Sequence, residues 1–172
     1  MSGGPILLCY DGSEQAGAAI ETAAAVLASR DAVVVTVYEP LSTWEPYDPA
    51  GFIGSSVASL SSGELGLQEI AAKLGQEKLD HGLELARAAG FNADGRLVEG
   101  KPWHAICALA TELDASVIVL GARGLSRVKS ALLGSVSAAV TVHAKRAVLV
   151  TSAHGSDVTP DDSGASPDES AS

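Results

Sequence analysis

Aromatic residues are scarce in this chain of 172 residues: phenylalanine, tryptophan and tyrosine together make up 4% of it. Apolar residues nevertheless account for 47%, and alanine, valine and leucine dominate among them. A core of small aliphatic side chains is typical of proteins in which helices pack on a sheet. The length suits one domain with a core of ordinary size, so no second domain is expected.

Cysteine is also rare. The chain has two, Cys9 in an apolar run and Cys107 in a helical pattern, and neither has another Cys or a His at the spacing of metal ligands. The dense, even set of cysteines that marks small secreted folds is absent. We therefore interpret both residues as small buried hydrophobic side chains.

Basic residues are fewer than acidic ones: the chain has 11 Lys and Arg and 21 Asp and Glu. The net charge of −10 argues against general binding to DNA or RNA, because contacts with a nucleic-acid backbone need a positive face. Five of the 21 acidic residues follow residue 151, in a segment rich in Ser, Asp, Gly and Pro. Residues 1–151 are therefore predicted to form the domain, and 152–172 a disordered acidic tail. The sequence shows no signal peptide and no membrane-spanning run, so we expect a cytoplasmic protein that binds no membrane.

Strand and helix patterns alternate along the chain. Short apolar or β-branched runs predict five strands, at residues 6–10, 33–38, 91–98, 116–120 and 147–150. Apolar residues three or four positions apart predict helices at 14–29, 68–89 and 103–113, and a last helix that includes 136–143. This order predicts an α/β domain with a mainly parallel sheet, whose strands end at one shared edge. Ligands of such sheets bind at that edge.

The strongest chemical signal follows the fourth predicted strand. Gly121-x-x-Gly124 is followed by nine residues and then by Gly134-Ser135, where the last predicted helix begins. Gly121 and Gly124 can take positive φ angles and let an anion approach the main chain, while a helix opening at Gly134 offers free N–H groups. The spacing is neither that of the P-loop nor that of the dinucleotide fingerprint. It predicts a phosphate site, with turns and a helix cap as the alternative.

Three further positions accompany this motif. Asp11 follows the first predicted strand, Val37 lies at the end of the second, and Gly100 follows the third. Together with Gly121-x-x-Gly124 and Gly134-Ser135-Val136 they resemble, in the same order, the nucleotide-binding pattern of the universal stress protein family. The resemblance extends over residues 5–151. It implies a Rossmann-like α/β fold, in which an open, five-stranded, mainly parallel sheet has helices on both faces.

The resemblance also implies a ligand. ATP is the expected cofactor, and Mg²⁺ bridging its phosphates would need few ligands from the protein. Asp11 would meet the ribose and the neighbourhood of the base, with an Asp-Gly turn that helps cap the first helix as the alternative. The main chain of Val37 would read the adenine edge, while Gly100 would line the pocket. Arg123 is a candidate for neutralising phosphate charge, with a solvated side chain as the alternative. The ribose and phosphates would be held by Gly121, Gly124, Gly134 and Ser135, with Val136 completing the motif.

The expected function is therefore that of an ATP-binding stress-response or regulatory protein that senses the nucleotide, commonly as a homodimer joined through its last strand. No catalytic residue is assigned, because the motif places no carboxylate or histidine firmly beside the terminal phosphate. Slow ATP hydrolysis is the enzyme alternative, and an interaction scaffold that binds no nucleotide is the third. Residues 41–65 are predicted to form a long loop, either a lid that orders on binding or a plain surface loop.

Overall fold

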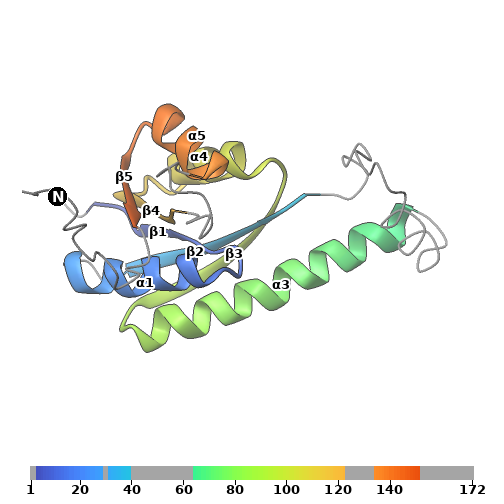
Figure 1. The fold of residues 1–172 in the computed structure, drawn as a ribbon, viewed down its shortest axis with the longest axis horizontal. Helices are drawn as coiled ribbons and strands as arrows, with labels where there is room; N and C mark the ends of the chain where they lie inside the picture. The colour runs from blue at the N-terminus through green and yellow to red at the C-terminus, as the bar shows by residue number, and fades with distance from the viewer. Residues whose placement is uncertain (1–2, 29–30, 40–63, 123–133, 152–172) are drawn as a thin grey trace, which may run out of the picture.

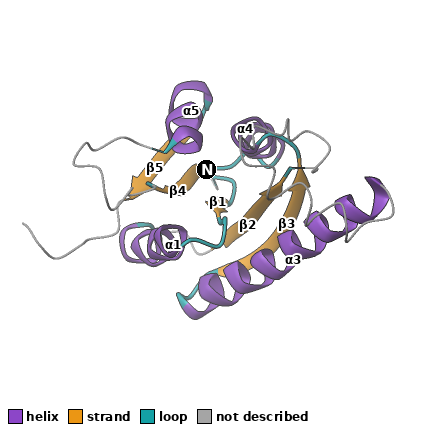
Figure 2. Ribbon diagram, turned by 45° about the vertical axis from the view of Figure 1, so that its right-hand side comes forward, coloured by secondary structure: helices purple, strands orange, loops and turns teal. Residues whose placement is uncertain are grey.

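In the computed structural model, five strands form one open sheet between two layers of helices (Figures 1 and 2). The structure describes residues 3–28, 31–39, 64–122 and 134–151. Along the chain the elements are β1 (Ile6–Cys9), α1 (Glu14–Val26), β2 (Asp31–Tyr38), α3 (Glu64–Ala88), β3 (Asn92–Glu99), α4 (Pro102–Glu112), β4 (Val117–Gly121), α5 (Ser135–His143) and β5 (Ala147–Thr151). The spatial order is β3-β2-β1-β4-β5, and all four neighbouring pairs are parallel. The predicted α/β fold is confirmed.

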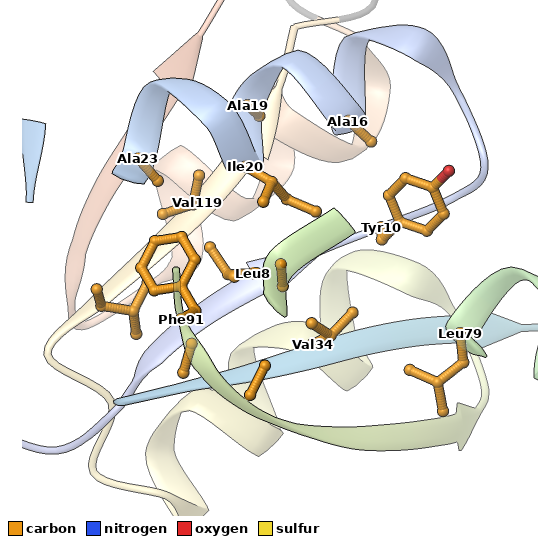
Figure 3. Close-up of a cluster of buried hydrophobic side chains, with 14 residues drawn as sticks. Leu8, Tyr10, Ala16, Ala19, Ile20, Ala23, Val34, Leu79, Phe91 and Val119 are labelled. Atoms are coloured by element: carbon orange, nitrogen blue, oxygen red, sulfur yellow. The ribbon is translucent and has the colours of Figure 1, made fainter. Parts of the chain in front are cut away.

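The central strand β1 is apolar throughout because the sheet is covered on both faces. Successive side chains of a strand point to opposite faces. Leu8 therefore joins the core beneath α1 and α3 (Figure 3), as does Ile6. Leu7 joins the core on the opposite side, with Ile106 and Leu109 of α4. Two separate apolar layers thus hold β1 from above and below.

Helices of the described part of the chain lie on both faces of the sheet (Figure 2). On one face α1 lies over β4 and β5, and α3 lies over β2 and β3; on the other, α4 and α5 contact each other. The side chain of Ser13 caps the start of α1, since its Oγ accepts a hydrogen bond of 3.2 Å from the Ala16 N–H. No helix in the described part of the chain is long and apolar enough to cross a membrane.

Two predicted boundaries are corrected. The first helix ends at Val26 and not at 29. The N–H of the next residue, Leu27, still donates to the Ala23 carbonyl at 2.9 Å. The second predicted helix begins at Glu64 and not at 68, so it includes the last two residues of the predicted 41–65 loop. The rest of that loop and the predicted acidic tail lie outside the described residues.

We expect the layered core to respond strongly to loss of volume in a central strand. Ile118 of β4 is fully buried, and the change Ile118→Ala should lower the free energy of unfolding by about 2–5 kcal/mol, since it leaves a cavity between sheet and helices. The control Val142→Ala, at a side chain that is 76% exposed, should change it by less than about 0.5 kcal/mol. Urea denaturation followed by circular dichroism measures both, and equal effects would contradict the described packing.

Candidate functional site

The ends of β1, β2 and β4 lie side by side at the carboxyl edge of the sheet. Cys9 pairs with Val35 and Leu8 with Val119, so Asp11 reaches the level of Val37 while Gly121 reaches the level of Tyr10. The sheet thus brings together Asp11, Val37 and Gly121. It does so beside β1, where the winding of the chain reverses, because β2 and β3 lie on one side of β1 and β4 and β5 on the other.

Asp11 stands in a tight turn that joins β1 to α1. Gly12 has a φ of +89°, which a side chain would disfavour, and the Ser13 N–H donates to Asp11 Oδ1 at 3.0 Å. Asp11 therefore has the turn-forming role that an Asp-Gly-Ser sequence favours. Its carboxylate is nevertheless exposed at the sheet edge, so the turn orients this carboxylate without burying it.

Gly121 is constrained by packing rather than by its φ angle. Among the described glycines only Gly12, Gly90 and Gly100 have positive φ, so Gly121 does not use the positive φ that glycine allows. A Cβ at Gly121 would lie 2.6 Å from the carbonyl carbon and oxygen of Gln15 in α1. The glycine is required because the amino end of α1 passes directly over the end of β4.

Gly100 follows β3, on the side of Val37 away from Asp11. Its φ is +139°, its N–H donates to the Tyr38 carbonyl at 3.0 Å, and a Cβ there would meet no atom within 4 Å. The Tyr38 hydroxyl donates to Glu99 Oε2 at 3.0 Å. Desolvation, together with this bond and the Glu99 charge, raises the pKa of Tyr38. Gly100 thus fastens the end of β3 to β2 beside Val37.

The second half of the glycine motif lies on α5. Gly134 is the N-cap of this helix and has no side chain to cap it, Ser135 is its first residue, and Val136 packs toward the core shared with α4. Arg123 and Gly124 lie outside the described residues. The structure therefore brings together Asp11, Val37, Gly100 and Gly121 at one edge, while the joining segment between Gly121 and Gly134 is largely outside the described ranges.

A groove of about 560 Å³ opens beside Asp11, between the β1–α1 turn and α3. It is lined by Asp11, Gly12, Ser13, Leu74, Glu77, Lys78 and His81. The groove was not predicted from the sequence, and the Leu74 side chain that lines it is 52% exposed. The signal available was the spacing of the four α3 residues, because positions 74, 77, 78 and 81 share one helical face.

Tyr10 connects this groove to the sheet. Its ring is buried, and its hydroxyl lies 2.8 Å from His81 Nδ1. The main chain of Tyr10 is bonded twice to β2, through its N–H to the Val35 carbonyl and through its carbonyl to Thr36 Oγ1, each at 2.9 Å. Tyr10 thus fixes the last residue before the turn to both β2 and α3.

The two cysteines behave as small hydrophobic residues at this site. Both are free and pack against the core beneath α4. Desolvation raises the pKa of the Cys9 thiol, with Cys107 and Asp11 adding to the effect, and desolvation raises the pKa of Cys107 as well. Both thiols are therefore protonated near neutral pH, and neither supplies a thiolate nucleophile there.

The fold and its edge define the class of this protein. It is a doubly wound α/β domain, of the kind that binds ligands where the strand order reverses. More narrowly, the chain belongs to the universal stress protein family, whose profile matches residues 4–152.

Individual relatives agree. A universal stress protein of Thermus aquaticus is 33% identical over 149 residues, which cover 84% of this chain and 96% of the relative. A universal stress protein solved in complex with cAMP is 27% identical, with a TM-score of 0.58 over 87% of this chain and 98% of that one. The structure of the hypothetical protein MJ0577 shares the fold at 23% identity, with a TM-score of 0.66 over 91% of this chain and all of that one.

The contact at Gly121 leads to a stability prediction. Gly121→Ala should lower the free energy of unfolding by about 1–3 kcal/mol, because its Cβ meets main-chain atoms that cannot rotate away. The control is Gly17→Ala in α1, where a Cβ would lie 3.6 Å from Leu85 Cδ1 and should stabilise the helix by up to about 1 kcal/mol. Thermal melts of both variants test this, and an unchanged melt for Gly121→Ala would refute the close approach.

Proposed function

We propose that residues 1–151 form one nucleotide-binding domain that holds an adenine nucleotide, with ATP as the leading candidate, and that the protein acts as a nucleotide sensor in a stress response. The observation that carries this proposal is the meeting of Asp11, Val37 and Gly121 at the point where the strand order reverses. Membership of the family and the cAMP complex of a relative support an adenine ligand.

The base would be read by the main chain of Val37. The Tyr10 N–H bonds the Val35 carbonyl, whereas the Gly100 N–H bonds the Tyr38 carbonyl. Because alternate residues of a strand turn their main-chain groups to opposite neighbours, those of Val37 point to the side of β1. There β1 has ended and the chain turns at Asp11, whose exposed carboxylate would accept hydrogen bonds from the ribose hydroxyls.

The phosphates would lie toward α5. Its first-turn N–H groups have no capping side chain at Gly134, and the helix dipole favours negative charge at that end. Arg123, Gly124 and Ser135 are proposed as further phosphate contacts on the motif alone. Among the described residues, no three His, Cys, Asp or Glu side chains gather to hold a metal ion. Mg²⁺, if bound, would therefore be held chiefly by phosphate oxygens and water.

The first test is a calorimetric titration with ATP. We expect a Kd in the micromolar range, which corresponds to a binding free energy on the order of −8 kcal/mol. Asp11→Ala should weaken binding about tenfold, because a charge-assisted hydrogen bond is lost. Glu21→Ala is the control: it removes an exposed carboxylate of α1 that does not line the groove, and it should leave ATP affinity nearly unchanged.

Two results would count against the proposal. If ATP gives no heat and does not change the melting temperature, the protein does not bind ATP, and an interaction scaffold is favoured. Phosphate release measured in the same samples distinguishes sensor from hydrolase, since the sensor should turn over far below the ~1 s⁻¹ of slow enzymes.

We further propose that the protein forms a homodimer through β5. This strand is an edge of the sheet, so one side of its backbone has no neighbouring strand in the described chain. The Ala122 N–H donates to the Thr151 carbonyl at 2.7 Å, which turns the main-chain groups of Val150 away from β4 and toward a partner.

Val150→Pro tests this dimer. Proline removes one outward N–H and is tolerated on an edge strand when that N–H faces away from the sheet. We expect light scattering to give the dimer mass for the wild type and the monomer mass for Val150→Pro, with Val142→Ala remaining dimeric. A wild-type monomer at all concentrations would rule the dimer out.

A further inference from the structure

The groove between the β1–α1 turn and α3 contains a cation that the fold does not use. The alkyl chain of Lys78 lies along Gly12, whose ideal Cβ would be 3.4–3.5 Å from the Lys78 Cγ, Cδ and Cε atoms. Asp11 and Glu77 line the same groove, yet among the residues that the structure describes Lys78 forms no ion pair with either. Its ammonium group is available to an anionic ligand.

His81 supplies a second donor in the same groove. Desolvation raises the pKa of Tyr10, so its hydroxyl keeps its proton at neutral pH. When that hydroxyl donates to His81 Nδ1, at 2.8 Å, the ring N–H that can donate to a ligand is on Nε2. The Tyr10 ring meets the imidazole edge-on, with centroids 5.7 Å apart, which fixes the orientation of the His81 ring.

The position of these donors relative to Asp11 indicates what they would bind. Asp11 belongs both to the proposed ribose contact and to the wall of the groove. A substituent on a ribose hydroxyl would therefore extend from Asp11 toward Lys78 and His81. The volume of about 560 Å³ lies within the usual range of ligand sites.

We propose that this groove receives a phosphate carried on the ribose of the nucleotide, so that the protein prefers an adenine nucleotide with a second phosphate on its 2′ or 3′ oxygen. This inference rests on the proposed nucleotide site. Lys78 and His81 donate to the added phosphate, and Asp11 accepts from the ribose hydroxyl that stays free. The carboxylates of Asp11 and Glu77 repel the phosphate, so the preference depends on the Lys78 charge.

Calorimetric titrations with AMP, adenosine 2′,5′-bisphosphate and adenosine 3′,5′-bisphosphate test the proposal at one pH and salt concentration. We expect one of the bisphosphates to bind about tenfold more tightly than AMP, as one strong charge-assisted contact would give. The two bisphosphates tell which ribose oxygen faces the groove. In Lys78→Met, which keeps an unbranched chain against Gly12 but removes the charge, the affinity ratio of bisphosphate to AMP should fall to about one.

Lys73→Met is the matched control, because Lys73 is an exposed lysine of the same helix that does not line the groove. It should leave the affinity ratio at its wild-type value. Equal affinities for AMP and both bisphosphates in the wild type, or an unchanged ratio in Lys78→Met, would overturn this inference and leave the nucleotide site intact. If AMP and ATP both fail to bind, the proposed function fails, and the groove proposal fails with it.

Discussion

The edge of the sheet depends on how firmly the end of β1 is held. Tyr10 is bonded through its main chain to Val35 and Thr36, and through its hydroxyl to His81 on α3. Because Tyr10, Val35 and Thr36 are buried, the two main-chain bonds are made where water competes little, which raises the cost of breaking them. A fixed Tyr10 in turn fixes where the Asp11 turn leaves the sheet. The positions of Asp11 and of the groove follow from this one residue.

The approach of α1 to β4 is the second constraint. The missing side chain at Gly121 lets the main chain of Gln15 pass over the strand end, so the start of α1 lies above the edge where β1 and β4 separate. Any larger residue would push α1, and the turn before it, away from the sheet. Gly121 therefore acts through packing, whereas Gly100 on the other side has the open surroundings and positive φ that were expected of a backbone cradle.

Sequence patterns predicted the strands and the shared edge because these follow from local apolar runs and from the handedness of parallel crossovers. The role of Gly121 was not predictable, since the contact that demands glycine comes from Gln15, far away in the chain. Nor was the exposure of Leu74, because a helical stripe shows which side chains share a face and not whether a sheet lies beneath them. The neighbouring Gly75 is buried and faces Leu97 of β3, whereas the Leu74 side chain is 52% exposed and lines the groove. The groove was not predictable either, because one of its walls is the β1–α1 turn and the other is a helix far away in the sequence.

The different origins of the main-chain groups at the sheet edge and of the side chains on α3 affect which nucleotides the protein could distinguish. At the edge, recognition of a base and of phosphates would rest mainly on main-chain groups of Val37, Gly121 and the start of α5, and main-chain groups discriminate little between nucleotides that share an adenine. Side chains must supply the rest, and beside Asp11 those side chains come from α3. Glu77 and Lys78 can change without disturbing the sheet, because they are exposed and lie on a helix that is anchored elsewhere, through Leu79 and Ala86. In the proposed function, the sheet edge would thus form a general adenine site, and the exposed face of α3 would determine which form of the nucleotide fits it.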